Sequence, residues 1–306
     1  MTKVLIATEK PFASGAAKQI GNVLGEAGFE YAFLEKYTDV QQLKDAVADA
    51  DAVIIRSDII DEAIMTVAPK LKIVVRAGAG YDNVDLKAAT AHDVVVMNTP
   101  GQNSNAVAEL ALGMMVFQAR NHFNGTSGTE LLGKKLGIHA YGNVGKHVAR
   151  IAKGFGMEVC AYDPFVKAEI MKVDGVEAVE NLEKLYADND YISLHIPANN
   201  ETKKSIGYEL LSKTKKGAML VNTARKEVID EEGMLRWFAD CDTFKYVSDI
   251  APDQKQQFEE KYENRCFFTP KKMGAQTAEA NNNAGVAAAR QIINFINNGD
   301  ITFKVN

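Results

Sequence analysis

The sequence predicts an α/β fold with two Rossmann-like domains, each built around a doubly wound parallel sheet. Three observations predict it. The chain has 306 residues, and at about 150 residues per domain this suggests two domains. Short β-branched runs alternate with longer amphipathic stretches, the pattern of parallel sheets covered by helices on both faces. The alternation stops once, after Asn98, and then resumes.

In the first third of the chain, apolar runs rich in Val and Ile are expected to form strands. The runs lie at 4–8, 31–34, 53–57, 73–78 and 94–98. Amphipathic stretches with helical spacing separate them, and we expect helices at 12–27 and 40–48.

The alternation stops at a long apolar helix that we predict over 105–120, with a polar, glycine-containing loop behind it. Six further strands are then expected, which suits a Rossmann sheet. A last helix over 277–297 should end at the stop signal Asn297–Gly299. The six strands lie at 135–142, 158–163, 191–197, 218–224, 246–251 and 266–271.

The composition excludes several classes of protein. Hydrophobic residues are 46% and charged residues 25% of the chain, as in ordinary globular domains and unlike disordered chains. No apolar run approaches the ~18 residues of a membrane helix. A net charge of −5 disfavours nucleic acid and anionic membrane as partners. Three separated cysteines without a CxxC pair indicate no disulfide framework, no metal site and a reducing cytoplasm.

A dinucleotide-binding turn comes at the end of the first of these six strands, after 136–140. Its G-x-G-x-x-G pattern has Ala140, Gly142 and Gly145 at the three glycine positions. Gly142 would let the backbone approach a pyrophosphate, and Gly145 would let the next helix pack closely. Asp163 ends the next strand, where a carboxylate binds the ribose hydroxyls of NAD. The alternative is a tight turn beside a solvated aspartate.

The carboxyl ends of the other strands also carry polar or glycine residues. Ligands bind at these ends in open α/β sheets, so we expect a small anionic substrate beside a dinucleotide. In the second series of strands they are His195, Thr223, Ala224, Arg225, Asp249, Lys271, Lys272 and Gly274. In the first series they are Arg56, Ser57, Arg76, Gly78 and Gly80.

Five motifs resemble the D-isomer-specific 2-hydroxyacid dehydrogenase family. They are the glycine turn, HIP at 195–197, RAGAGYDNVD at 76–85, MNTPGQNSNAVAEL at 97–110 and VNTARKEVIDEEGML at 221–235. Within the family they are most similar to short phosphoglycerate dehydrogenases that have a lysine-type active site and no regulatory domain. The resemblance implies an NAD domain, 99–276, inserted in a substrate domain, 1–98 and 277–306. It also implies a homodimer that oxidises 3-phospho-D-glycerate to 3-phosphohydroxypyruvate, a step of serine biosynthesis.

The resemblance assigns roles to individual residues. Arg225 corresponds to the arginine that orients the substrate, and Asp249 to the acid near the nicotinamide carboxamide. The remaining cofactor positions are Ala79, Gly142, Asn143, Val144, Gly145, Asp163, His195, Ile196, Thr223, Ala224 and Gly274. The candidates for the acidic groups of a 2-hydroxy or 2-keto acid are Arg56, Ser57, Arg76, Gly78 and Asn103.

The chain departs from the family pattern at three places. Gln254 stands where most members have the glutamate of the acid/base pair, and Lys272 stands where they have its histidine. The usual Gly-Gly after the arginine is Lys226-Glu227. A neutral lysine needs a lowered pKa, which a nearby carboxylate would oppose and burial or positive charge would favour. Loss of the glutamate is therefore consistent with a lysine base.

Several alternatives stay open for these residues. Lys272 is expected to carry the hydroxyl proton, but it could instead only bind an anion. Lys271 is the alternative lysine, and His195 the alternative base. Arg225 could be a structural ion pair with Glu227 or Asp230, and Arg56 and Arg76 could be strand-end ion pairs.

Alternatives also stay open for the whole chain. The loop after the apolar helix lacks the arginines that longer relatives place near the substrate phosphate, so a glyoxylate/hydroxypyruvate reductase is the alternative enzyme. An NAD-sensing binding protein with little turnover is the alternative of another class. The apolar helix is expected to pair with its copy in a dimer, or else to be buried within one chain. The chain ends soon after its last helix, so we expect no serine feedback through a regulatory domain.

Overall fold

The computed structural model describes all 306 residues, which divide into two compact units. Unit 1 comprises Met1–Asn103 and Gln276–Asn306, and unit 2 comprises Ser104–Ala275. Each unit contains one parallel sheet, and unit 2 is inserted in the sequence of unit 1. The predicted fold class is therefore confirmed. The boundaries predicted from the sequence, after residues 98 and 276, lie a few residues from these divisions.

The sheet of unit 1 has five parallel strands in the order β2-β1-β3-β4-β5. All four residues of β3 are buried, as expected for a strand covered on both faces. The strand order reverses between β1 and β3, and a crevice at such a switch point is the usual ligand site of open α/β sheets. The strands are β1 (Lys3–Thr8), β2 (Glu30–Glu35), β3 (Ala52–Ile55), β4 (Ile73–Arg76) and β5 (Val95–Asn98).

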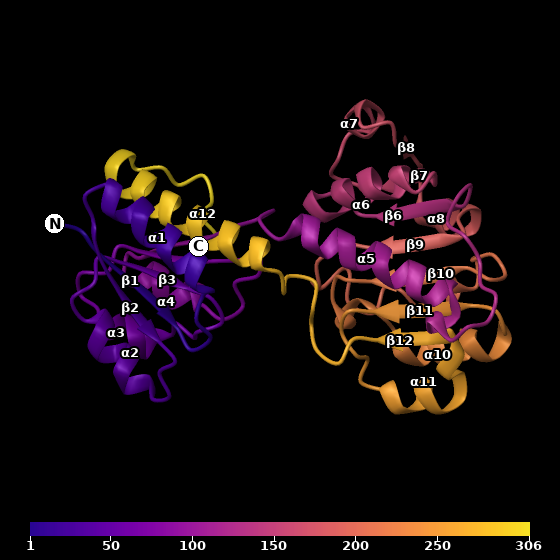
Figure 1. Ribbon diagram of the computed structural model, residues 1–306, viewed down its shortest axis with the longest axis horizontal. Helices are drawn as coiled ribbons and strands as arrows, with labels where there is room; N and C mark the ends of the chain where they lie inside the picture. Colours follow the sequence, from indigo (N-terminus) through magenta and orange to yellow (C-terminus); the bar gives the residue numbers. More distant parts are fainter. The chain divides into compact units, whose positions relative to one another are not determined.

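Helices on both faces cover this sheet, and α12 returns to unit 1 from the far end of the chain. Figure 1 shows α12 lying beside α1. Thr277 caps the start of α12, and Gly299 ends it with a φ of 66°, a conformation that favours glycine. The helices of unit 1 are α1 (Ser14–Glu26), α2 (Val40–Val47), α3 (Glu62–Thr66), α4 (Leu86–Ala91) and α12 (Ala278–Asn298).

The sheet of unit 2 has seven parallel strands in the order β12-β11-β10-β9-β6-β7-β8. Its order reverses between β6 and β9, which marks the switch point. All six predicted strands are present, and the two-residue β8 was missed because it is too short to show periodicity. The strands are β6 (Lys135–His139), β7 (Glu158–Tyr162), β8 (Glu177–Ala178), β9 (Tyr191–Leu194), β10 (Met219–Asn222), β11 (Lys245–Ser248) and β12 (Cys266–Phe268).

The strands of unit 2 end earlier than the sequence predicts. The run at 191–197, for example, leaves the sheet after Leu194. His195 still donates its backbone N–H to the carbonyl of His139 in β6, and the residues after it lie outside the sheet. The helices are α5 (Ser104–Ala119), α6 (Asn143–Gly154), α7 (Ala168–Val173), α8 (Leu182–Asp188), α9 (Tyr208–Leu211), α10 (Glu231–Asp240) and α11 (Lys255–Tyr262), and the 3-10 turns are η1 (Asn121–Phe123), η2 (Lys226–Val228) and η3 (Glu263–Arg265).

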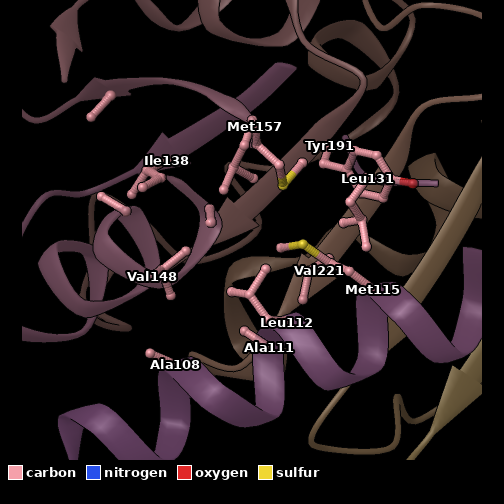
Figure 2. Packing of buried hydrophobic residues seen from close by; sticks show 14 of the residues in the cluster. Ala108, Ala111, Leu112, Met115, Leu131, Ile138, Val148, Met157, Tyr191 and Val221 are labelled. Carbon is pink, nitrogen blue, oxygen red and sulfur yellow. The ribbon is translucent and has the colours of Figure 1, made fainter. Parts of the chain in front are cut away.

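One face of α5 packs into the core of unit 2. Figure 2 shows Ala108, Leu112 and Met115 pointing from this helix toward residues of the sheet and of α6, among them Ile138 and Val221. This face of α5 is therefore buried within its own chain and is not available for pairing with a second copy.

The other face of α5 is only partly covered. Leu110, Val116 and Phe117 are partly buried and Gly113 is exposed. An apolar stripe thus remains partly uncovered on this helix, beside the exposed Glu109.

Candidate active site

The turn after β6 has the geometry of an anion-binding helix start. A Cβ at Gly145 would lie 2.4 Å from the carbonyl oxygen of Ala140, whereas a Cβ at Gly142 would meet nothing within 4 Å. Gly142 is the N-cap of α6 and offers no capping side chain. The first N–H groups of the helix, at Asn143 and Val144, are thus left for an external acceptor.

Asp163 lies beside this turn and is partly exposed. Its Oδ2 accepts the backbone N–H of Tyr141 at 2.7 Å, and its Oδ1 accepts that of Phe165 at 2.8 Å. Each carboxylate oxygen can accept a second hydrogen bond. The carboxylate is held in place by the turn and still has capacity for two ribose hydroxyls.

At the end of β10, Thr223 is 6% exposed and its Oγ1 has no hydrogen-bond partner. A buried hydroxyl without a partner is uncommon and calls for an explanation. Ala224 follows it and is also buried. Together with the glycine turn and Asp163, this orphaned hydroxyl shows that the residues present fit a dinucleotide lying along the carboxyl ends of the strands.

His195 and His139 are adjacent in the same sheet. The His195 N–H donates to the His139 carbonyl, and its ring Nε2 lies 2.9 Å from Ser193 Oγ. Burial and the neighbouring His139 lower the pKa of His195 to about 3. His139 contacts Tyr186 through its ring, as expected of a hydrogen-bonded core residue. The imidazole of His195 therefore stays neutral near pH 7. Ile196, next in the chain, is buried.

Arg225 follows β10 and is half-buried. Its only side-chain bond runs from Nη1 to the carbonyl of Ala224 at 2.9 Å. It takes part in none of the salt bridges of the structure. The alternative of a structural ion pair with Glu227 or Asp230 is therefore not realised, and most of the guanidinium donors are available to a ligand.

Asp249 lies after β11 and is 1% exposed. Its Oδ1 accepts the N–H of Met273 at 2.7 Å and its Oδ2 that of Gly274 at 2.8 Å. It therefore holds the loop that carries Lys272. The Lys272 side chain is exposed, so the burial that we expected to lower its pKa is not present in this structure.

Gln254, at the position of the family's glutamate, lies in a segment tied down by charged residues. Glu231 accepts the backbone N–H groups of Asp253 and Gln254, both at 2.8 Å. Lys226 forms an ion pair with Asp253. Two of the three departures from the family pattern are thus linked through Asp253, the residue before Gln254. Sequence reasoning missed this link because the residues are far apart in the chain and show no common motif.

In unit 1, Arg56 and Arg76 lie together at the ends of β3 and β4. Nε of Arg76 donates to the carbonyl of Arg56 at 2.9 Å. A Cβ at Gly78 would lie 1.5 Å from Nη1 of Arg76, so only glycine lets this guanidinium lie across the backbone. Ser57 is exposed beside them. The structure thus groups four of the predicted substrate residues.

Two further predicted residues lie in unit 1. Ala79 is exposed, and its carbonyl accepts Nδ2 of Asn98 at 2.6 Å. Asn103 is half-buried directly before α5. Its side chain has no hydrogen bond in the structure, so nothing in unit 1 orients it.

Two general features bear on the class of site. No group of three or more His, Cys, Asp or Glu residues is arranged to hold a metal ion, and the three cysteines are free thiols. No helix has both the length and the apolar character needed to cross a bilayer.

Comparisons with known proteins identify the family of the chain. A sequence model of the D-isomer specific 2-hydroxyacid dehydrogenase NAD binding domain matches residues 107–270. The NAD⁺-bound 3-phosphoglycerate dehydrogenase of Entamoeba histolytica is similar over 100% of this chain and 98% of its own, with 48% identity and a TM-score of 0.88.

Curated relatives include enzymes of two activities. The D-3-phosphoglycerate dehydrogenase of Methanocaldococcus jannaschii is 33% identical over 82% of this chain. The chain spans 51% of the length of that relative. The hydroxypyruvate reductase of Thermotoga maritima is 32% identical over 84% of this chain and 88% of its own. The chain therefore belongs to the D-isomer specific 2-hydroxyacid dehydrogenases, with that family's NAD-binding domain at residues 107–270.

Proposed function

We propose that the protein oxidises 3-phospho-D-glycerate to 3-phosphohydroxypyruvate with NAD, as a cytoplasmic homodimer. The observation that carries the proposal lies at the ends of the neighbouring strands β10 and β11. Arg225, after β10, has no ion-pair partner, and Asp249, after β11, holds the loop that contains Lys272. The resemblance over the full length of the Entamoeba histolytica enzyme supports the substrate.

Unit 2 supplies the groups for the reacting carbon. Bound NAD supplies the acceptor for the hydride that leaves the substrate's hydroxyl-bearing carbon. Arg225 binds the carboxylate and the reacting oxygen through paired N–H groups and stabilises the negative charge that develops on that oxygen. The neutral amine of Lys272 accepts the hydroxyl proton, so carbon loses a hydride and oxygen loses a proton in the same reaction.

The pKa of Lys272 must fall for this role. Because the side chain is exposed, burial by the protein alone does not achieve it. The positive charges of Arg225 and of the oxidised cofactor act in the required direction. The absence of a carboxylate at Gln254 removes a group that would act against it.

Unit 1 supplies cationic groups for the anionic end of the substrate, and we propose it as the substrate domain. Arg56 and Arg76 are its two candidates, with Ser57 and the amide of Gly78. Guanidinium groups suit carboxylate and phosphate because they offer parallel N–H donors.

The alternative is reduction of hydroxypyruvate without a phosphate group. It is favoured by the similarity to the Thermotoga maritima reductase over 88% of that protein and by the absence of arginines from residues 121–134. Oxidation of NADH should be followed by absorbance with phosphohydroxypyruvate, hydroxypyruvate and glyoxylate in parallel. Preference for the phosphorylated acid is expected. Preference for hydroxypyruvate or glyoxylate selects the reductase, and no oxidation with any of them favours an NAD-sensing binding protein.

The homodimer is proposed through the outer stripe of α5. Leu110, Gly113 and Phe117 lie on this stripe and remain at least partly exposed, and a self-complementary patch is what a two-fold interface requires. Light scattering should give twice the chain mass for the wild type. Leu110→Asp should shift it toward the monomer, and a wild-type monomer would contradict the proposal.

A further inference from the structure

A buried carboxylate lies at the switch point of the unit 1 sheet. Asp58 follows β3, one of the two strands between which the strand order reverses, and it is 4% exposed. It forms no salt bridge in the structure. Buried charges are costly unless they are well satisfied, so its contacts require an explanation.

Three donors from the ends of three strands satisfy Asp58. Its Oδ1 accepts the N–H of Glu9 at 2.8 Å and the hydroxyl of Tyr37 at 2.7 Å. Its Oδ2 accepts the N–H of Arg56 at 3.1 Å. Glu9 follows β1, Tyr37 follows β2 and Arg56 follows β3. One side chain therefore joins the carboxyl ends of three neighbouring strands.

The peptide that Asp58 holds supports both arginines of unit 1. The Arg56 carbonyl accepts Nε of Arg76. The Arg56 guanidinium donates to the carbonyls of Lys10 and Pro11, at 2.9 and 3.2 Å, and to Oδ1 of Asn281 at 2.6 Å. Of its five N–H donors, the Nε–H and one Nη2–H have no acceptor in the protein. These two are the donors that an anionic ligand can use.

We propose that Asp58 is a positioning residue for substrate binding, which fixes the Arg56 peptide so that the two remaining donors of Arg56 keep one geometry and the Arg76 guanidinium, which is bonded to the same peptide, keeps its place. The inference rests on the proposed function for the identity of the ligand, a phosphorylated 2-hydroxy acid. Asp58 itself does not touch the substrate.

The hydrogen-bond partners of Asp58 explain why this position requires a carboxylate. A negative charge beside an anion site weakens anion binding, so charge alone would disfavour it. All three partners of Asp58 are donors, and only a carboxylate presents acceptors to all of them. Asparagine would turn its NH₂ toward the N–H of Glu9 or of Arg56, leaving that donor unsatisfied.

The test compares Asp58→Asn and Tyr37→Phe with the control Asp85→Asn. Asp85 is an exposed N-cap of α4 in the same unit that accepts the N–H groups of Lys87 and Ala88, and asparagine caps helices equally well. Steady-state kinetics with 3-phosphoglycerate should be combined with NAD binding by calorimetry. Amide hydrogen exchange of Glu9 and Arg56 should be measured by NMR.

Asp58→Asn should raise KM for 3-phosphoglycerate about tenfold, with kcat within about twofold and NAD affinity unchanged. Exchange at Glu9 and Arg56 should become at least about tenfold faster. Tyr37→Phe removes one donor only and should raise KM about twofold to threefold. The control should change none of these quantities.

An unchanged KM in an active Asp58→Asn enzyme overturns the inference and leaves the proposed function intact. If the wild type turns over no 2-hydroxy acid, the proposed function fails. The positioning role is then tested by amide exchange alone, and unchanged exchange at Glu9 and Arg56 in Asp58→Asn overturns it. If Asp58→Asn does not fold, Tyr37→Phe decides by the same measurements, and wild-type KM and exchange rates overturn the inference.

Discussion

The backbone N–H of Gly274 donates to Oδ2 of Asp249 at 2.8 Å. A second bond, from the N–H of Met273 to Oδ1, closes the same turn. The two bonds fix the backbone on the C-terminal side of Lys272, while its side chain remains exposed. This arrangement suits a proton carrier, because the backbone is held in place while the amine can be reached by a bound substrate.

Replacing Lys272 by methionine should therefore lower kcat at saturating substrate. General acid–base catalysis contributes about 10² to 10⁴ in rate, and a loss within that range is expected. Lys271→Met is the matched control and should keep kcat within about twofold, because an adjacent exposed lysine outside the proton path contributes little. Near-normal kcat with a raised KM for Lys272→Met would instead assign the lysine to anion binding.

Restoring the family's carboxylate by Gln254→Glu should shift the pH profile of oxidation. A carboxylate near Lys272 raises the lysine pKa, so the rise of kcat/KM with pH should move about one unit toward alkaline pH. Gln256→Glu adds the same charge at an exposed position of α11 whose side chain bonds Glu260 and not Gln254, and it should shift the pH profile much less. If the pH profile shifted equally in the two variants, the shift would come from the added charge in general and not from its position near Lys272.

Gly142→Ala should weaken NAD binding without destabilising the fold. Gly142 has space for a Cβ in the structure, but the cofactor's pyrophosphate must approach its backbone. Calorimetry should show a Kd for NAD raised about tenfold or more, with unchanged Tm. Gly154→Ala also places a Cβ in open space, at the far end of α6, and should change neither. Unaltered affinity in Gly142→Ala would contradict this position for the pyrophosphate.

Ala140→Gly should stabilise unit 2 slightly. Ala140 has a φ of 79°, a left-handed conformation that costs about 1–2 kcal/mol for a residue with a Cβ. Glycine removes that cost but gives the unfolded chain more freedom, which offsets about 0.4–1 kcal/mol. The net expectation is a gain of between zero and about 1.6 kcal/mol, seen as a rise of Tm in a thermal scan. A lower Tm would mean that the Cβ makes contacts that outweigh the strain.

Acid should destabilise unit 2 because of His139. Burial lowers its pKa to about 4, whereas the unfolded chain has the ordinary value of about 6.5. The unfolded state therefore binds more protons between these values, and stability falls as the pH drops through 6.5. The slope from this residue is about 1.4 kcal/mol per pH unit until about pH 4. Urea unfolding at several pH values should show it, and His139→Gln should reduce the slope.

The sequence was sufficient for the sheets and for the cofactor turn. The apolar runs of both units became strands. Inner strands such as β3 are buried along their whole length, as parallel strands covered on both faces are, whereas the edge strand β2 is mostly exposed. The turn from Ala140 to Gly145 and the carboxylate of Asp163 were predictable because their chemistry is local: they lie in one strand–helix unit and at the end of the next strand. The short β8 lacked enough residues to carry a pattern.

Contacts between segments distant in the chain appear only in the tertiary structure. Asp58 gave no motif, yet it joins Glu9, Tyr37 and Arg56, and Glu231 with Lys226 holds the segment of Gln254. Hydrogen bonding and burial at these points depend on which strand ends the fold brings together, and residue identity alone does not reveal that. The residues alone therefore determined the fold class and the kind of ligand, whereas packing in three dimensions decided which carboxylates hold the functional groups in place.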